Sequence, residues 1–218
     1  MINLLDFNQA QLAEYFVGLG EKPFRAKQLM RWIHHFGVSD VEQMTDIAKS
    51  LREKLAATTT ITPPNVQLEQ ISNDGTRKWL VGAGSGNGVE TVFIPEDDRG
   101  TLCISSQVGC TLNCRFCHTG TQRLVKNLNF SEIINQVMIA KEQLNDWKEQ
   151  KIITNIVLMG MGEPFYNYDN VKTAVEILKD KDGLNYGPKK ITVSTAGIAD
   201  KIPQAAKEIG TYLALSLH

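Results

Sequence analysis

The sequence predicts an α/β protein in which a parallel sheet is covered by helices. From residue 101 onward, nearly uninterrupted apolar segments alternate with segments of helical periodicity. This alternation is typical of buried parallel strands that are connected by helices. Before that point, a helical region is followed by short segments of strand character with turn residues between them. We therefore expect three regions: a helical N-terminal domain at 1–61, a β linker region at 62–98 and the parallel α/β domain at 99–218.

Apolar residues at helical spacing predict three helices in the first region. One stretch runs from Leu12 to Leu19, and a second runs from Phe24 to Ile33. Asp46 is expected to cap the third helix at its N-terminus. The second helix carries basic residues largely off its apolar stripe, and these either contact RNA phosphates or only face solvent: Arg25, Lys27 and Arg31.

Residues 62–98 are expected to form short strands after a Pro-Pro break at residues 63–64. The strands are predicted at 66–72, 77–81 and 89–94, with an Asn-Asp-Gly turn between the first two. The glycine-rich segment 82–88 resembles a nucleotide-binding loop only weakly. Such a loop must open a helix, whereas a strand follows here, so we predict a hairpin loop instead.

The third region is predicted to hold four parallel strands, at 102–106, 152–159, 191–194 and 212–217. Between them, helices are expected to begin at caps Ser131 and Asp169, and a third to span 198–209. In folds of this kind, functional residues gather at the C-terminal ends of the strands. A cysteine-containing loop and three further segments fall there: Gly162-Glu163, Ser194 and Ser216-Leu217-His218.

Three cysteines with CxxxCxxC spacing are the strongest chemical signal: Cys110, Cys114 and Cys117. Three thiolates can hold three irons of a [4Fe–4S] cube and leave the fourth iron open for a substrate. A zinc site would need a fourth ligand, and the adjacent His118 offers poor geometry for it. Unligated thiols remain an alternative, whereas a disulfide framework is disfavoured in a chain of 218 residues with four cysteines.

The composition is that of an ordinary cytoplasmic protein. Apolar residues make up 42%, charged residues make up 22%, and the formal net charge is −1. No apolar run approaches the roughly 20 residues of a membrane span, and the N-terminus lacks the pattern of a secretion signal. Residues 101–130 contain no acidic residue, and their basic side chains either face an anion or are solvated: Arg115, Arg123 and Lys126.

Several motifs in this order resemble the RlmN family of radical S-adenosylmethionine (SAM) enzymes. They are Val89-Glu-Thr-Val-Phe-Ile-Pro95, Cys103-Ile-Ser-Ser-Gln-Val-Gly-Cys110 with the cysteine triad, Met159-Gly-Met-Gly-Glu-Pro164 and Leu215-Ser-Leu-His218. The resemblance covers essentially the whole chain. It implies a partial radical SAM βα barrel, with about four of six parallel strands. It also implies methylation of carbon 2 of adenine in 23S rRNA and tRNA.

The resemblance implies a role for each matched residue. The cysteine triad would bind a [4Fe–4S] cluster, and SAM would chelate its open iron. The remaining SAM contacts would come from Gly162, Glu163, Ser194, Ser216, Leu217 and His218. Glu90 matches the family's proton acceptor, although its residue type alone indicates an exposed strand carboxylate. Cys103 matches the cysteine that resolves a covalent enzyme–RNA intermediate by forming a disulfide, although alone it would be a small buried apolar residue.

The implied reaction uses two SAM molecules, of which one methylates a cysteine near the family's C-terminus. The second is cleaved to a 5′-deoxyadenosyl radical that activates this methyl group for addition to adenine. The resemblance further implies a monomer, an electron donor such as flavodoxin, and RNA as the macromolecular partner.

The chain departs from the family pattern because no cysteine follows Cys117. The methyl-carrying cysteine and the last two barrel strands are absent, so we expect a fragment or a truncated reading frame that cannot complete the reaction. Two other functions stay open: a Cfr-like enzyme that methylates carbon 8 of the same adenine, and an inactive remnant that binds RNA or SAM.

Overall fold

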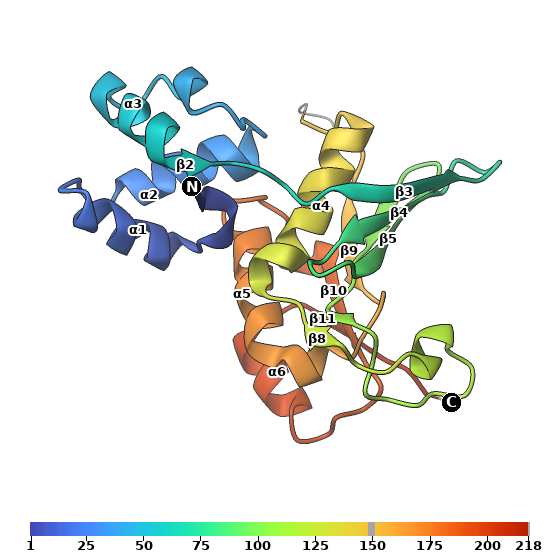
Figure 1. The fold of residues 1–218 in the computed structure, drawn as a ribbon. Helices are drawn as coiled ribbons and strands as arrows, with labels where there is room; N and C mark the ends of the chain where they lie inside the picture. The colour runs from blue at the N-terminus through green and yellow to red at the C-terminus, as the bar shows by residue number, and fades with distance from the viewer. Residues whose placement is uncertain (148–150, 218) are drawn as a thin grey trace.

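The computed structural model describes residues 1–147 and 151–217 (Figure 1). Its main sheet has seven strands in the order β11-β10-β9-β6-β5-β4-β3. Four neighbouring strands are parallel: β6 (Gly100–Cys103), β9 (Asn155–Leu158), β10 (Ile191–Thr195) and β11 (Tyr212–Leu215). The predicted α/β fold with four parallel strands is therefore confirmed.

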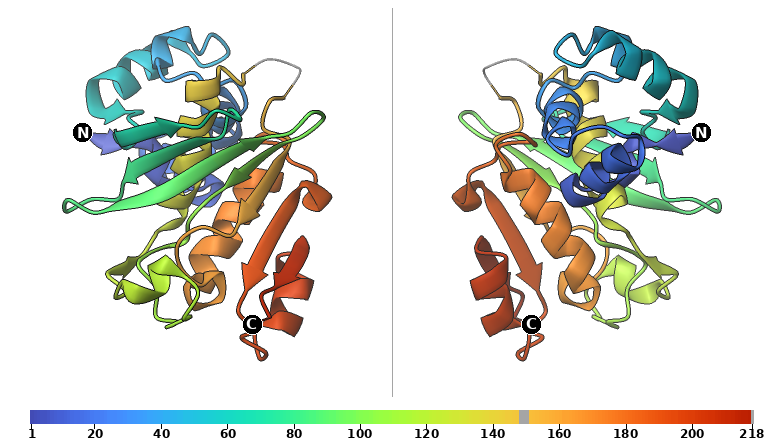
Figure 2. Two further views of the ribbon diagram at one scale, coloured as in Figure 1. Left: turned by 90° about the vertical axis from the view of Figure 1, so that its right-hand side faces the viewer. Right: turned by 90° about the vertical axis from the view of Figure 1, so that its left-hand side faces the viewer.

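Helices cover one face of this sheet, as the two views of Figure 2 show. They are α4 (Phe130–Leu144), α5 (Tyr168–Lys179) and α6 (Ile202–Glu208). The last helix is shorter than the predicted span of 198–209. The opposite face of the sheet carries no helix among the described residues. None of the described helices has the length and apolar character that crossing a bilayer requires.

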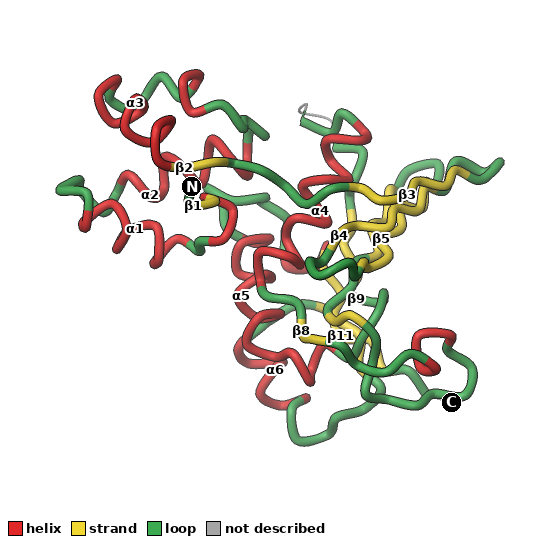
Figure 3. Tube along the Cα trace, in the orientation of Figure 1, coloured by secondary structure: helices red, strands yellow, loops and turns green. Residues whose placement is uncertain are grey.

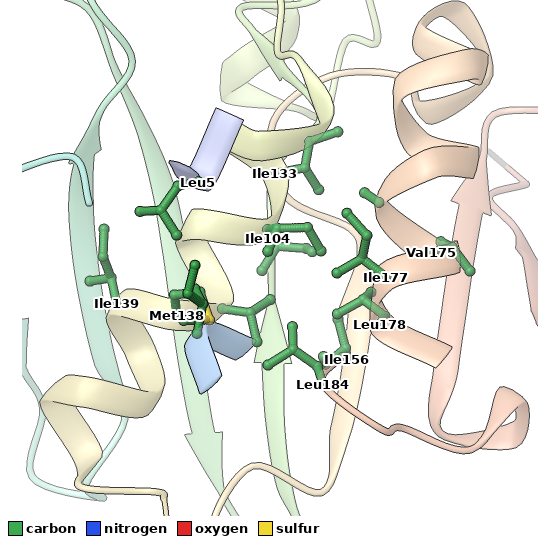
Figure 4. Packing of buried hydrophobic residues seen from close by; sticks show 14 of the residues in the cluster. Leu5, Ile104, Ile133, Met138, Ile139, Ile156, Val175, Ile177, Leu178 and Leu184 are labelled. Atoms are coloured by element: carbon green, nitrogen blue, oxygen red, sulfur yellow. The ribbon is translucent and has the colours of Figure 1, made fainter. Parts of the chain in front are cut away.

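The core lies between the sheet and α4 and α5 (Figure 4). Ile133 and Val137 of α4 and Val175 of α5 are fully buried against strand residues such as Ile156. Burying each side chain of this size contributes roughly 1.5–3 kcal/mol. The parallel pairing of these strands places their C-terminal ends at one edge of the sheet, which carries the site.

The antiparallel half of the sheet is built from β3 (Val66–Ile71), β4 (Arg77–Gly82) and β5 (Gly88–Pro95). β5 also pairs with β6, so these strands continue the parallel sheet directly. The glycine-rich segment is a turn between β4 and β5, closed by a bond from Asn87 N to Gly84 O. The hairpin interpretation of this segment is confirmed, because no helix follows it.

The N-terminal region contains three helices: α1 (Gln9–Gly18), α2 (Arg25–Met30) and α3 (Lys49–Thr58). A π-helical turn over Arg31–His35 extends α2, and the 3-10 turns Leu4–Asp6 and Val41–Gln43 complete the region (Figure 3). β1 (Ile2–Asn3) pairs with β2 (Thr59–Thr60) and joins its two ends. The Oγ of Ser131 donates to Asp6 Oδ1 at 3.0 Å and links this region to α4.

Three predicted helix caps are wrong. The Asp46 carboxylate does not cap α3 but accepts a bond from Trp32 Nε1. Ser131 lies inside α4, whose cap is Asn129, in a reciprocal capping box with the third helical residue. Asp169 lies in the first turn of α5, whose cap residue makes no side-chain bond. Short polar residues are frequent near helix starts, and tertiary contacts decide which of them caps.

Candidate active site

A cavity of about 640 Å³ opens at the C-terminal ends of the parallel strands. Its walls come from three places: the loop after β6, the loop after β9, and the ends of β10 and β11. Among its lining residues are seven that were predicted from sequence: Cys110, Cys114, Cys117, Gly162, Glu163, Ser194 and Ser216. The fold therefore brings together residues that lie up to 106 positions apart in the chain.

The three cysteines lie on a loop whose two ends are paired. β7 (Gln107–Val108) pairs with β8 (Lys126–Asn127) at the root of this loop. Within the loop, Cys117 N donates to Cys114 O at 3.1 Å, and Gly120 N donates to Cys117 O at 3.0 Å. A 3-10 turn over His118–Thr121 follows the last cysteine. The cysteine loop, residues 110–123, is thus a short loop whose two ends are held together by the pairing of β7 with β8.

The donor set fits an iron–sulfur cluster. All four cysteines are free thiols of intermediate exposure. Among the described residues, no group of three or more His, Cys, Asp or Glu side chains converges on one ion. A cubane cluster takes one thiolate on each of three irons, so its ligands surround it rather than meet at a point. Three thiols lining one open cavity meet that requirement.

The surroundings of Cys110 favour its protonated thiol, whereas a bound cluster requires the thiolate. Burial raises its pKa, and the nearby thiols and Glu163 act in the same direction, while a bond from Leu112 N to its Sγ at 3.4 Å acts against them. A free thiol in this place prefers to keep its proton. Bound iron would supply the positive charge that favours the thiolate.

The turn after β9 carries Gly160-Met161-Gly162-Glu163 and is packed without spare room. A Cβ at Gly160 would lie 2.6 Å from Ser105 Oγ, and a Cβ at Gly162 would lie 2.5 Å from the Cβ of Gln107. Gly162 also has a φ of 97°, which side chains rarely tolerate. Met161 N donates to Ser105 Oγ at 2.9 Å. Position 162 therefore requires glycine for two reasons, the positive φ and the lack of space for a Cβ.

Glu163 is buried, with 3% of its surface exposed, and its carboxylate joins two loops. One oxygen accepts from Phe165 N at 3.1 Å, in the 3-10 turn Pro164–Asn167, and the other accepts from Ala196 N at 2.8 Å, just after β10. Each carboxylate oxygen can accept more than one bond. The carboxylate therefore retains capacity for a ligand ammonium group while it holds the cavity wall together.

The ends of β10 and β11 supply two hydroxyls. Ser194 Oγ and Ser216 Oγ lie 3.3 Å apart, and Ser216 N donates to Thr195 O at 2.9 Å. The Leu217 side chain is 79% exposed and lies outside the cavity lining. His218 lies outside the described residues. The structure thus brings the two serines together and leaves the Leu217 side chain apart.

Glu90 and Cys103 are not among the residues that line the cavity. Val92 pairs with Cys103, and Glu90 shares the face of Val92, so the side chains of Glu90 and Cys103 both point to the helix-free face of the sheet. Burial raises the pKa of the Cys103 thiol to about 11, while a bond from Met159 N acts against it. The Glu90 carboxylate accepts from Lys78 Nζ at 3.0 Å.

Polar residues at the end of β6 form a network that sequence reasoning missed. Ser105 Oγ donates to Glu90 O at 2.6 Å, and Asn167 Nδ2 donates to Ser106 O at 2.8 Å. Gln107 is fully buried and bonds to both loops of the cavity. The available signal was three consecutive polar residues, Ser105 to Gln107, where the apolar character of this segment ends. Polar groups in such a place are rarely buried without partners.

Two family profiles match the chain. The profile of the radical SAM superfamily matches residues 104–218. The profile of the ribosomal RNA large subunit methyltransferase N-terminal domain matches residues 2–61.

Individual relatives agree with these profiles. The chain is 51% identical over 221 residues to the dual-specificity RNA methyltransferase RlmN of Rhodospirillum rubrum, and it covers 52% of that protein. It is also 51% identical over 219 residues to RlmN of Pseudomonas putida, of which it covers 58%. A crystal structure of a radical SAM methyltransferase from Sphaerobacter thermophilus superimposes with a TM-score of 0.88 at 38% identity. The chain matches over its full length in these three comparisons but spans only 52–64% of the relatives.

Proposed function

Because the chain belongs to the radical SAM superfamily, and within it to the RlmN family, we propose that it forms the cluster- and SAM-binding part of an RNA methyltransferase. One observation carries the proposal. A single cavity is lined by all three cysteines, by Gly162 and Glu163, and by Ser194 and Ser216. The likeness to a methyltransferase-associated domain over residues 2–61 supports RNA as the substrate.

In this proposal, the cysteine triad holds three irons of a [4Fe–4S] cluster. When bound, the cluster supplies the electron for reductive cleavage of SAM. Glu163 accepts hydrogen bonds from the SAM amino group, and Ser194 and Ser216 bond to its polar atoms. The backbone of Leu217 is proposed to bind SAM as well, whereas His218 lies outside the described residues. The buried carboxylate is already fixed by two backbone donors, so it binds without reorganising.

The substrate base is proposed to lie over the helix-free face, where Glu90 and Cys103 point. Glu90 removes the proton from carbon 2 of the adenine, and Lys78 keeps its carboxylate in place. The Cys103 sulfur, after loss of its proton, then attacks the sulfur that bridges enzyme and RNA. The bond from that sulfur to the methylene carbon breaks, the carbon keeps the electron pair and takes up a proton to become the methyl group, and the two sulfurs are left joined in a disulfide. No cysteine follows Cys117 in this sequence, so the proposal assigns the role of methyl carrier to none of its residues.

The proposed substrates are 23S rRNA and tRNA, modified in the cytoplasm by a monomer. The electron is proposed to come from a small redox protein of the flavodoxin kind. RNA as the substrate is supported by the relatives that are named dual-specificity RNA methyltransferases. The electron donor, the monomeric state and the cytoplasmic location follow only from the family resemblance.

The test uses a bacterium that lacks its own adenine-methylating enzyme of this family, and it analyses the RNA of that bacterium. The complete gene from which this chain derives is introduced, and RNA digests are analysed by mass spectrometry for 2-methyladenosine in rRNA and tRNA. We expect both to be restored. Glu90→Gln should lower the yield about 100-fold or more, since a positioned base contributes that much. Glu96→Gln, in an exposed pair with Arg99, is the matched control and should leave it unchanged.

Each other outcome has a defined meaning. Methylation at carbon 8 alone would place the protein with the Cfr-like enzymes. Absence of any methylated adenine, with the protein folded and the cluster present, would favour an RNA- or SAM-binding remnant.

A further inference from the structure

The side-chain amide of Gln107 lies between the two loops that line the cavity. Gln107 is fully buried. Its Oε1 accepts from Glu163 N at 2.8 Å, and its Nε2 donates to Asn127 Oδ1 at 2.7 Å. One bond reaches the Glu163 loop, and the other reaches the strand that closes the cysteine loop. Gln107 itself stands three positions before Cys110.

Close packing and further hydrogen bonds hold the Gln107 amide in place. Gly162 packs so closely on the Gln107 side chain that a Cβ there would overlap it, at 2.5 Å. The backbone N of Gln107 donates to Met161 O at 3.1 Å. Asn127 extends this hydrogen-bond network to the loop after β9, because its Nδ2 donates to Tyr166 O at 3.3 Å. The two loops are therefore joined by a continuous chain of hydrogen bonds through the side chains of Gln107 and Asn127.

Only an amide satisfies both neighbours. It offers an acceptor to the Glu163 N–H and a donor to Asn127, whereas an ionised glutamate offers acceptors alone and a leucine offers neither. Without the acceptor, the N–H of Glu163 would be a buried donor with no partner. Such a donor is costly enough to shift the loop that carries it.

We propose that Gln107 is a positioning residue that fixes Glu163 relative to the cysteine loop, and so sets the distance between the amino-group end of SAM and the cluster. The inference rests on the proposed function. It assigns to Gln107 no contact with SAM and no part in the chemistry.

The experiment compares Gln107→Leu with Asn127→Ala, which removes only the outer partner. Gln122→Leu is the matched control, because Gln122 is exposed on the same cysteine loop. The dissociation constant for SAM is measured by equilibrium dialysis on the reconstituted full chain. Amide hydrogen exchange of residues 110–123 is measured on the metal-free chain. Thermal unfolding of each protein is recorded alongside.

We expect Gln107→Leu to weaken SAM binding roughly tenfold, the equivalent of one lost buried hydrogen bond. Exchange in residues 110–123 should become faster by a similar factor. Asn127→Ala should give a smaller change in the same direction, and the double variant should be no worse than Gln107→Leu. The control should match the wild type in both measurements.

Two results would overturn the inference. One is a folded Gln107→Leu protein with wild-type SAM affinity and wild-type exchange. The other is a lowered unfolding temperature with SAM affinity and loop exchange unchanged, since Gln107 would then contribute only to the stability of the core. If Gln107→Leu does not fold, Asn127→Ala decides by the same criteria. A wild-type protein that fails to bind SAM would instead contradict the proposed function, and the exchange measurement would still test Gln107.

Discussion

The loop after β9 and the cysteine loop face the same cavity, but different contacts hold them. In the first, Glu163 is 3% exposed and its carboxylate accepts two backbone bonds from other segments. In the second, Phe116 is 62% exposed. The bonds among its cysteines are local turn bonds such as that from Cys117 N to Cys114 O. Long-range bonds enter mainly at its root, through β7 and β8.

This difference indicates how each half of the site acquires its geometry. The loop after β9 is set by the fold, because its glycines and buried carboxylate admit one arrangement. The cysteine loop is fixed at its base and acquires its final geometry from what its thiolates bind. Substitution and labelling experiments can distinguish the two halves of the site, and Cys114→Ala is expected to have the largest effect.

Cys114→Ala should abolish cluster assembly and leave the fold intact. Iron content after anaerobic reconstitution is expected to fall to background, because three thiolates are needed. The free energy of unfolding of the metal-free chain should change by less than about 0.5 kcal/mol, as for most partly exposed sites. Cys103→Ala is the control and should retain the iron. Loss of iron in Cys103→Ala, or retention in Cys114→Ala, would contradict the assignment of ligands.

Cys103 should resist alkylation at neutral pH. Burial raises its pKa to about 11 from an ordinary 9.0, so the reactive thiolate is about 100-fold scarcer below pH 9 than in an unstructured peptide. The rate should rise about tenfold per pH unit and level off near pH 11. Timed iodoacetamide labelling of the reduced, metal-free chain, followed by peptide mass spectrometry, measures this. Labelling of Cys103 at the rate of a cysteine peptide at pH 8 would show that its strand is not buried.

Gly162→Ala should destabilise the chain more than Gly84→Ala. Both glycines have positive φ, at 97° and 77°, but only Gly162 has neighbours where a Cβ would stand. Both variants bear the backbone strain, and Gly162→Ala adds an overlap with Gln107 that costs about 1–3 kcal/mol. Urea unfolding of the two variants measures the difference. Equal losses would mean that the Gly162 turn relaxes, and the loop after β9 would then be less rigid than its packing indicates.

Much of the fold could be predicted from the sequence because its signals are local. Apolar runs predicted the four parallel strands, and helical periodicity between them predicted the helices that connect them. Helix starts were less predictable. Asp46, Ser131 and Asp169 all have a capping residue type, yet Asp46 instead bonds to Trp32 across 14 positions. Capping competes with tertiary partners that a local pattern does not contain.

The site shows the same division. Spacing alone predicted the cysteine triad as a cluster site, because three close thiolates suit that chemistry. The order of the strands predicted that the Gly162-Glu163 turn and the two serines lie at the same edge of the sheet, and the family resemblance implied their roles toward SAM. Only the tertiary structure decided that the Glu163 carboxylate bonds to Ala196, 33 positions away, and that Gln107 bonds to Glu163, 56 positions away. Such bonds depend on the order and register of β6, β9 and β10, which place distant polar groups within reach. Burial then makes those bonds obligatory, because a buried polar group without a partner is costly.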